Sequence, residues 1–182
     1  PRARRLQMLG TRLRAPQFWH STASSAISDA LLPLSAAYIA GSWLRERAAN
    51  PPLKAAAPVL CVGSALVGGA GKTPVALAIA DFLQSTRPRL NVHFLSRGYG
   101  GAASGPLRVD SLKHDAGAVG DEPLLLAARA PTWVGARRCD AAAAACDAGA
   151  QLLLMDDGLQ HLTLHRDVSL LCVDAVDRLG NG

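Results

Sequence analysis

The sequence predicts an α/β protein with a mostly parallel sheet flanked by helices. Short continuous apolar runs alternate with helix-forming stretches along residues 51–182, as they do where strands are buried on both faces of a parallel sheet. A glycine-rich turn that ends in Lys72 and Thr73 joins the first apolar run to the first helix. Residues 1–50 differ from this body in charge and hydropathy. We therefore expect two parts, a basic N-terminal segment with a helix at residues 1–50 and an α/β domain at residues 51–182.

The N-terminal segment combines a cluster of arginines with an apolar run. The first fourteen residues contain no acidic residue, which indicates contact with an anionic membrane or nucleic acid, or a solvated basic terminus. Residues 30–44 are apolar, with Trp19, Tyr38 and Trp43 near the ends, but this run is shorter than the roughly 20 residues that span a bilayer. The pattern favours a helix that lies in a membrane interface. A helix packed on the domain and a targeting peptide are the alternatives.

The body is predicted to alternate strands and helices after a linker at Asn50-Pro51-Pro52. The expected strands are residues 58–62, 91–96, 107–109, 132–134, 151–155 and 168–173. The expected helices are residues 74–85, 124–129 and 137–148. The strands are predicted from continuous apolar runs, and the helix at residues 137–148 is predicted from its alanine content. Residues 102–119 are expected to be rich in loops. The composition is 49% hydrophobic but only 4% aromatic, so the core should consist of small and aliphatic side chains.

A phosphate-binding loop of the P-loop type is predicted between the first strand and the first helix. Its sequence is Leu66-Val67-Gly68-Gly69-Ala70-Gly71-Lys72-Thr73. Glycines let backbone N–H groups turn toward an anion, and the helix that follows directs its positive end to the same place. Lys72 would reach the β- and γ-phosphates of a nucleotide, and the Thr73 hydroxyl would reach Mg²⁺. Leu66 replaces the first glycine of the strict pattern, so the match is a variant.

Polar groups follow several of the predicted strands. They are the P-loop, Ser96-Arg97, Asp156-Asp157 and Asp174. Because ligands of open α/β sheets bind at the carboxyl ends of the strands, we expect these groups to share one edge of the sheet. An apolar strand that ends in an acid is typical of the Walker B strand, whose carboxylate holds Mg²⁺. Either acid of the pair fits this role, and Asp156 is favoured.

Phosphoryl transfer also needs a residue that orients or deprotonates the acceptor. Asp121, in a loop between two strands and next to Glu122, is the leading candidate, and His161 is the second. An acidic pair at the start of a helix also fits simple complementarity to the helix dipole. Arg97 and Arg138 are candidates to neutralise charge on the transferring phosphate, although solvated surface arginines fit the sequence equally well.

The four cysteines indicate neither a metal site nor a disulfide framework, because the sequence has no C-x-x-C spacing. We expect a reducing compartment. Cys61 and Cys172 lie within apolar runs and are predicted to be buried thiols.

Further motifs occur in order along the chain. They are Leu95-Ser96-Arg97-Gly98-Tyr99-Gly100-Gly101, Val119-Gly120-Asp121-Glu122-Pro123, Asp156-Asp157-Gly158-Leu159-Gln160-His161, Arg166-Asp167 and Leu179-Gly180-Asn181-Gly182. Together with the P-loop they resemble the tetraacyldisaccharide 4'-kinases, the lipid A 4'-kinases of Gram-negative bacteria. The resemblance covers nearly the whole chain, and the family's P-loop also lacks the first glycine. It implies an ATP- and Mg²⁺-dependent transfer of phosphate to the 4'-hydroxyl of a tetraacylated glucosamine disaccharide 1-phosphate.

The resemblance also implies where the chain acts and with which residues. The family's N-terminal membrane-associating helix favours the membrane for residues 18–47, at the cytoplasmic face of the bacterial inner membrane. The implied partners are the lipid substrate and the membrane surface, without nucleic acid or a protein partner. The implied site residues are Lys72 and Thr73 for phosphates and Mg²⁺, Asp121 for activation of the acceptor hydroxyl, Asp156 and Asp157 for the metal, and Arg97, Arg138, Gln160 and His161 for substrate or phosphate.

The chain departs from the family pattern at a few positions. Ser64 replaces a usual asparagine, Leu66 and Ala70 stand where a polar residue is common, and Leu159 replaces a usual aromatic residue. The family's sequences continue beyond Gly182 with a lobe whose histidine partners the acid at Asp121, so we expect a truncated member. A deviant P-loop regulatory or partitioning ATPase and an inactive nucleotide-binding fragment of the kinase are the alternatives. The ATPase would explain neither residues 97–101 nor residues 120–123.

Overall fold

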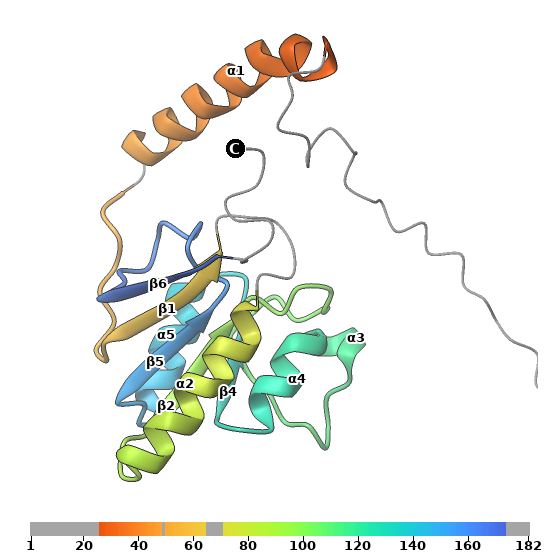
Figure 1. Cartoon of the computed structure of the whole chain (residues 1–182). Coiled ribbons are helices and arrows are strands. Elements are labelled where there is room, and N and C mark those ends of the chain that lie inside the picture. Colours follow the sequence, from red (N-terminus) through yellow and green to blue (C-terminus); the bar gives the residue numbers. More distant parts are fainter. Residues whose placement is uncertain (1–25, 49, 65–70, 174–182) are drawn as a thin grey trace, which may run out of the picture.

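The computed structural model describes residues 26–48, 50–64 and 71–173, and it confirms the predicted α/β class (Figure 1). The strands are β1 (Val59–Ser64), β2 (Val92–Ser96), β3 (Leu107–Arg108), β4 (Thr132–Val134), β5 (Leu152–Asp156) and β6 (Val168–Cys172). The helices are α1 (Ala26–Ala48), α2 (Lys72–Thr86), α3 (Ala116–Val119), α4 (Asp121–Ala127) and α5 (Arg138–Asp147). The sheet has the order β3-β4-β2-β5-β1-β6. Neighbouring strands are parallel except for the short β3, which pairs antiparallel with β4.

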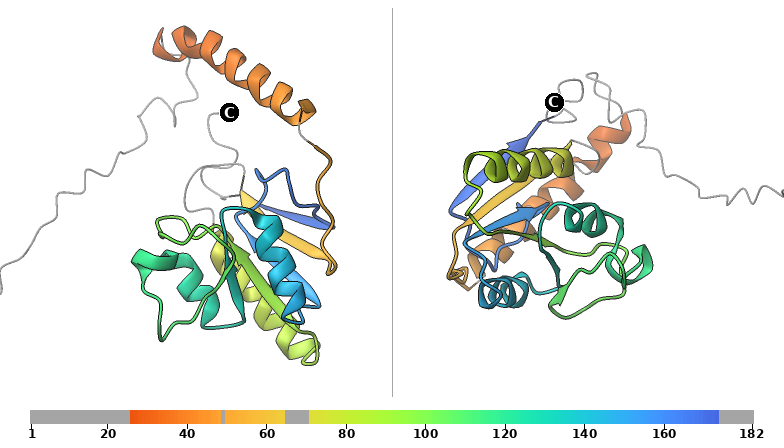
Figure 2. Two further views of the ribbon diagram at one scale, coloured as in Figure 1. Left: turned by 180° about the vertical axis from the view of Figure 1, so that it is seen from behind. Right: turned by 90° about the horizontal axis from the view of Figure 1, so that it is seen from below.

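Helices cover both faces of the central strands. On one face, buried alanines of α2 and Leu126 of α4 pack with Val62, Phe94 and Leu154. On the other face, alanines of α5 pack with Cys61, Leu95, Leu153 and Met155, and the view from below in Figure 2 shows α2 and α5 on opposite faces of the sheet. Each central strand therefore needs apolar side chains pointing both ways, which is why its sequence is a continuous apolar run. Alanines on the helices allow a close approach to the sheet, so a core with few aromatic residues is still well filled.

The edge strand β6 lies within the predicted strand 168–173, but its Cys172 is not the buried thiol that was predicted. Val168, Leu170 and Leu171 are exposed, and Cys172 is half-buried rather than buried. The prediction was wrong because β6 has a neighbour, β1, on one side only, and an apolar run by itself does not reveal whether a strand lies at an edge. Cys61, in the centre of β1, is fully buried as predicted.

Two local features differ from the sequence expectations. The loop-rich region contains a short helix, α3, whose first turn is capped by Asp115, with the carboxylate accepting a hydrogen bond from the Ala118 N–H at 2.9 Å. Helix α4 begins at Asp121 rather than at Leu124. Asp121 and Glu122 are therefore the first two residues of the helix and do not lie in a preceding loop.

Helix α1 stands apart from the sheet (Figure 1) and exposes its apolar side chains. The exposed large apolar residues are Leu31, Leu32, Leu34, Tyr38, Ile39, Trp43 and Leu44. Their spacing distributes them around the whole circumference of the helix. The helix thus does not pack against the body as one alternative required. Within the described ranges, no helix has the combined length and apolar character that crossing a bilayer requires.

The carboxyl ends of the central strands meet at one edge of the sheet. The parallel register places Val62 of β1 beside Asp156 of β5, and Ser96 of β2 beside Val134 of β4. Helix α2 starts at the same edge, directly after the glycine-rich loop. As predicted, the polar groups that follow β1, β2 and β5 are gathered there. Asp174, the fourth such group, lies outside the described residues.

Candidate functional site

The first two residues of α2 face the two acids at the end of β5. The Thr73 hydroxyl donates a hydrogen bond to Oδ2 of Asp156 at 2.9 Å. The Lys72 ammonium lies 3.0 Å from Oδ1 of Asp157 in an ion pair. The predicted phosphate-binding side chains and the predicted metal-side acids are thus in direct contact. Of the predicted loop, Gly71 starts α2 with a left-handed φ of 73°, while Leu66, Val67, Gly68, Gly69 and Ala70 lie outside the described residues.

Asp156 combines deep burial with an unused oxygen. Its side chain is only 2% exposed, and its Oδ1 atom has no hydrogen-bond partner among the described residues. Burial raises the pKa of this carboxyl to about 6, the carboxylates of Glu122 and Asp157 add to the rise, and the Thr73 hydroxyl and Lys72 oppose it. A buried carboxylate is costly unless a cation or further donors compensate it. The site therefore favours a cation at this oxygen.

The oxygens available there suit Mg²⁺. A free carboxylate oxygen of Asp156 lies beside the hydroxyl of Thr73, and hard oxygen ligands of this kind are what Mg²⁺ prefers. In the described part of the chain, no group of three or more His, Cys, Asp or Glu side chains forms a ready-made metal site. That is the usual situation for Mg²⁺, which is bound by one or two carboxylates together with substrate phosphates and water. Of the two acids, Asp156 is buried and has one oxygen without a hydrogen-bond partner among the described residues, and Asp157 pairs with Lys72.

A tight turn after β5 gives the two acids these different directions. Asp157 has a φ of 52°, in the left-handed region that non-glycine residues seldom adopt. Its backbone N–H donates to the Val62 carbonyl at 2.9 Å, so the turn stays attached to β1. The next residue packs so closely on Met155 that a Cβ on Gly158 would come within 2.5 Å of that side chain. Leu159 fills the corresponding space above Gly63, where a Cβ would lie 2.5 Å from it.

The loop after β2 supports the start of α4. Gly120 has a φ of 89°, and a Cβ there would lie 2.5 Å from the Tyr99 carbonyl oxygen. Hydrogen bonds of 3.0 Å join Ala102 to Gly117 and Ala103 to Ala118. The Arg-Gly-Tyr-Gly-Gly and Gly-Asp-Glu-Pro motifs thus form one packed unit. This unit presents Asp121 at the surface, and it brings the Glu122 carboxylate close enough to Asp156 to raise the pKa of that acid. The sequence indicated Glu122 only as a helix-dipole partner, because its closeness to Asp156 depends on tertiary packing.

Positive side chains surround the acids on the side of α5. Arg138, the first residue of α5, is 3% exposed and donates from Nη1 to the Gly135 carbonyl at 2.8 Å. The alternative of a solvated surface arginine is therefore wrong for Arg138, whereas Arg97 is exposed. Burial lowers the pKa of Arg138 to about 10, with Arg97 adding to the decrease, and Asp157 opposes it. The Nε atom of Arg138 lacks a hydrogen-bond partner within the described ranges, so this buried cation retains a free donor.

His161 lies in the same positive environment. Burial lowers the pKa of its imidazole, and Arg138, Arg97 and Arg166 lower it further. Its Nε2 atom is 2.9 Å from the Thr163 hydroxyl. A neutral ring among arginines is suited to hydrogen bonding near an anion. Gln160, the neighbouring predicted contact, is exposed.

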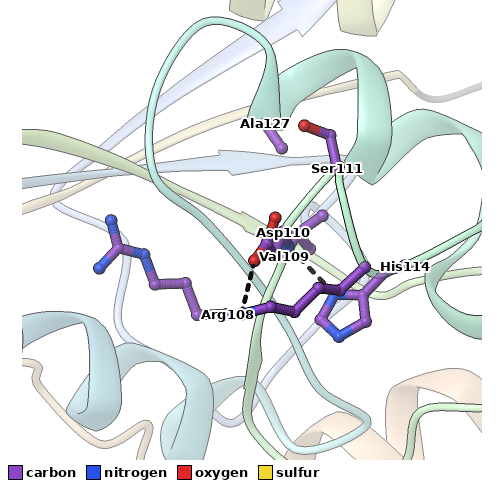
Figure 3. A pocket seen from close by; sticks show the side chains of 7 residues that line it. Arg108, Val109, Asp110, Ser111, His114 and Ala127 are labelled. Carbon is purple, nitrogen blue, oxygen red and sulfur yellow. Dashed lines mark hydrogen bonds and ion pairs between the residues drawn. The ribbon is translucent and has the colours of Figure 1, made fainter.

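A cavity of about 530 Å³ lies elsewhere on the body and is not this site (Figure 3). It is lined by residues around Asp110 and is adjacent to the amino end of β4, where the Val109 N–H donates to the Thr132 carbonyl at 2.8 Å. Two of its lining groups are bound to Asp110: the Lys113 ammonium pairs with its carboxylate at 3.1 Å, and Nδ1 of His114 accepts from its backbone N–H at 3.0 Å. The acids and the phosphate-binding residues lie at the opposite, carboxyl edge of the sheet.

Comparison with known proteins agrees with this arrangement. A family model described as LpxK, tetraacyldisaccharide-1-P 4'-kinase, matches residues 27–182. The tetraacyldisaccharide 4'-kinase of Parvibaculum lavamentivorans is 52% identical over 174 residues, which are 93% of this chain and 50% of that protein. The enzyme of Rhodospirillum centenum is 47% identical over 173 residues, with the same coverage. The chain thus spans about half the length of the curated relatives it matches.

A solved structure supports the same relationship. The crystal structure of LpxK from Aquifex aeolicus in complex with ATP matches with a TM-score of 0.69 and 30% sequence identity, over 80% of this chain and 48% of that one. The family model covers residues 27–182, which is most of the chain, and the solved structure shares its fold. The chain belongs to the tetraacyldisaccharide 4'-kinase family.

Proposed function

We propose that this chain binds Mg²⁺ and ATP and takes part in transferring the γ-phosphate to the 4'-hydroxyl of a tetraacyldisaccharide 1-phosphate in lipid A biosynthesis. The observation that carries the proposal is the double contact between the start of α2 and the end of β5, Thr73 with Asp156 and Lys72 with Asp157. The lipid substrate in this proposal is inferred from the family relationship and not from these contacts. The family match also favours the kinase over a regulatory or partitioning P-loop ATPase.

In this proposal Lys72 exchanges partners when a nucleotide arrives. Without ligand its charge is paired with Asp157, whose side chain is 57% exposed. The Lys72 side chain is only 15% exposed, so the β- and γ-phosphates would take over the pairing of its charge, while solvent would hydrate the displaced Asp157 carboxylate. Thr73 and Asp156 would hold Mg²⁺, which when bound neutralises charge that develops on the phosphate oxygens.

Asp121 is proposed to orient or deprotonate the acceptor hydroxyl. Its exposed position at the start of α4 leaves it accessible to a second substrate, and Glu122 beside it acts electrostatically on Asp156. A general base in this role contributes roughly 10²–10⁴-fold to rate. The buried cation Arg138 and exposed Arg97 would contact phosphate groups, and Gln160 and His161 would contact substrate or phosphate nearby.

Helix α1 is proposed to associate with the membrane that contains the lipid substrate, at the cytoplasmic face of the bacterial inner membrane. The exposed apolar side chains of α1 would lose contact with water in the apolar boundary of a membrane, which is favourable. Arg45 and Arg47 in its last turn suit anionic headgroups at the boundary.

The test begins with nucleotide binding by the chain in detergent. Titration with a fluorescent ATP analogue and Mg²⁺ should show saturable binding, which Lys72→Ala should weaken at least tenfold. Arg87→Met, at the far end of α2, is a matched control that should bind normally. Transfer of labelled γ-phosphate to the disaccharide lipid is then measured for the chain and for a protein with the full length of the relatives. Binding without transfer by the chain alone would identify it as a nucleotide-binding fragment. Absence of transfer by the full-length protein would refute the kinase assignment.

A further inference from the structure

We propose that Arg166 is a positioning residue that holds the turn after β5, so that Asp157 points to Lys72 and Asp156 points to Thr73. The inference deepens the proposed function and rests on it for the identity of the ligand. The Arg166-Asp167 motif has no part in the mechanism above, yet its side chains contact both the acid-bearing turn and the central strand β1.

Arg166 contacts the backbone directly after the acids. Its Nη1 atom donates to the carbonyl of Gly158 at 3.3 Å and also to the carbonyl of Leu159. These carbonyls follow Asp157, the residue with φ 52°. A left-handed non-glycine residue costs free energy and persists only where its surroundings compensate. The guanidinium of Arg166 donates charge-assisted hydrogen bonds to the carbonyls of Gly158 and Leu159, which lie beyond the end of β5.

The chain on both sides of Arg166 is anchored to the strand β1 and its approach. The Asp167 N–H donates to the Val59 carbonyl at 2.9 Å, and Oδ2 of Asp167 accepts from the Val59 N–H at 2.8 Å. On the other side, the His165 N–H donates to the Leu53 carbonyl at 2.8 Å. The backbone of Arg166 is therefore fixed, and its half-buried side chain reaches back from a rigid support. Because its backbone is fixed, Arg166 can hold the turn after β5 in one position instead of moving with it.

The charge of Arg166 is felt within the site. It adds to the lowering of the pKa of His161 that burial begins, and it opposes the rise that burial causes in the pKa of Cys61. Loss of the guanidinium would remove a donor from the Leu159 carbonyl and would leave the Gly158 carbonyl with the His161 N–H at 3.0 Å. We expect this loss to release Asp157 toward a more ordinary φ. The hydrophobic clusters do not include Arg166, so the fold should survive a substitution that keeps the bulk of its stem.

The test uses Arg166→Met, Arg166→Lys and the distant control Arg87→Met in the full chain. The first readout needs no ligand: hydrogen exchange at the Asp157 amide, which donates to Val62. Arg166→Met should lower the protection of this amide at least tenfold and leave the amide of Leu154 within β5 unchanged, whereas Arg166→Lys should restore part of it. Unchanged protection at Asp157, or an equal loss at Asp157 and Leu154, would overturn the inference.

The second readout is the affinity for ATP measured with and without Mg²⁺. Arg166→Met should reduce the gain in affinity that Mg²⁺ provides by tenfold or more, while the affinity for metal-free ATP stays within threefold. A melting temperature lowered with the Mg²⁺ gain intact would show a merely structural role and overturn the inference. If the unsubstituted chain bound no ATP, the proposed function would fail, and the exchange measurement would still decide whether Arg166 positions the turn.

Discussion

Replacing Asp156 by asparagine should stabilise the ligand-free protein. The carboxyl is 2% exposed, and its pKa rises from 3.8 to about 6 in the folded state. One pKa unit corresponds to about 1.4 kcal/mol, so holding this group ionised at neutral pH costs about 3 kcal/mol of folding free energy. Asparagine keeps the shape and an oxygen for the Thr73 hydroxyl but carries no charge. We expect Asp156→Asn to recover a large part of that cost.

The gain should depend on pH in a defined direction. Between pH 3.8 and about 6 the folded state binds the proton of Asp156 and the unfolded state does not. The unsubstituted protein therefore loses stability as pH rises through this window, and the loss stays constant above it. The advantage of Asp156→Asn should be close to zero near pH 4 and reach its full size above pH 6.

Urea denaturation followed by circular dichroism, with chelator present, measures the effect at pH 7.5 and pH 4.5. Asp157→Asn is the matched control, because its carboxylate is 57% exposed and paired with Lys72. Loss of this pair should lower stability, because the Lys72 side chain is 15% exposed and would lose its partner, so the control should shift stability in the direction opposite to Asp156→Asn. Equal stability of Asp156→Asn and the parent protein at pH 7.5, or a gain of the same size at both pH values, would refute the reasoning. Because an amide oxygen is a weaker Mg²⁺ ligand than a carboxylate, the same substitution should weaken Mg²⁺-dependent ATP binding.

Three further predictions follow from the other parts of the site. Gly120→Ala should lower the free energy of unfolding by about 2 kcal/mol or more, because a Cβ at φ 89° would lie 2.5 Å from the Tyr99 carbonyl oxygen. The control in the same urea experiment is Gly105→Ala, which should be nearly neutral because no described atom lies within 4 Å of the added Cβ. Asp121→Ala, in a protein of the relatives' length, should lower kcat by roughly 10²–10⁴-fold with little change in ATP affinity, and a normal kcat would exclude the role. Removal of residues 1–48 should release the protein from anionic lipid vesicles in a flotation assay, and continued binding would place the membrane contact on the body.

Much of the fold and site could be predicted because the signals are local. The continuous apolar runs of β1 and β5, the glycines before Lys72 and the acids after Met155 each lie within a few consecutive residues. A parallel sheet then sends the ends of its strands to one edge without further information. This rule predicts from the sequence alone that the P-loop and the acid pair lie at the same edge of the sheet.

Other features depend on neighbours that the sequence does not show. β6 has the apolar pattern of a central strand, yet its place at the edge of the sheet leaves its side chains exposed. Arg138 is the first residue of an alanine-rich helix, and only packing makes it a buried cation. Arg166 is one arginine among many in the sequence, and its role depends on carbonyls seven and eight residues earlier in the chain.

The sequence by itself determined which chemical groups are candidates for binding a nucleotide and its acceptor: the lysine and threonine after a glycine-rich loop, the paired acids after an apolar strand, and the acid of the Gly-Asp-Glu-Pro motif. Only the tertiary structure decided how these groups pair. Thr73 contacts Asp156, which lies 83 residues later in the sequence. The left-handed turn directs Asp157 to Lys72 and not to Thr73. The physical reason is that burial, and the register of β5 beside β1, give two chemically identical carboxylates different surroundings, so one can serve a metal and the other a lysine.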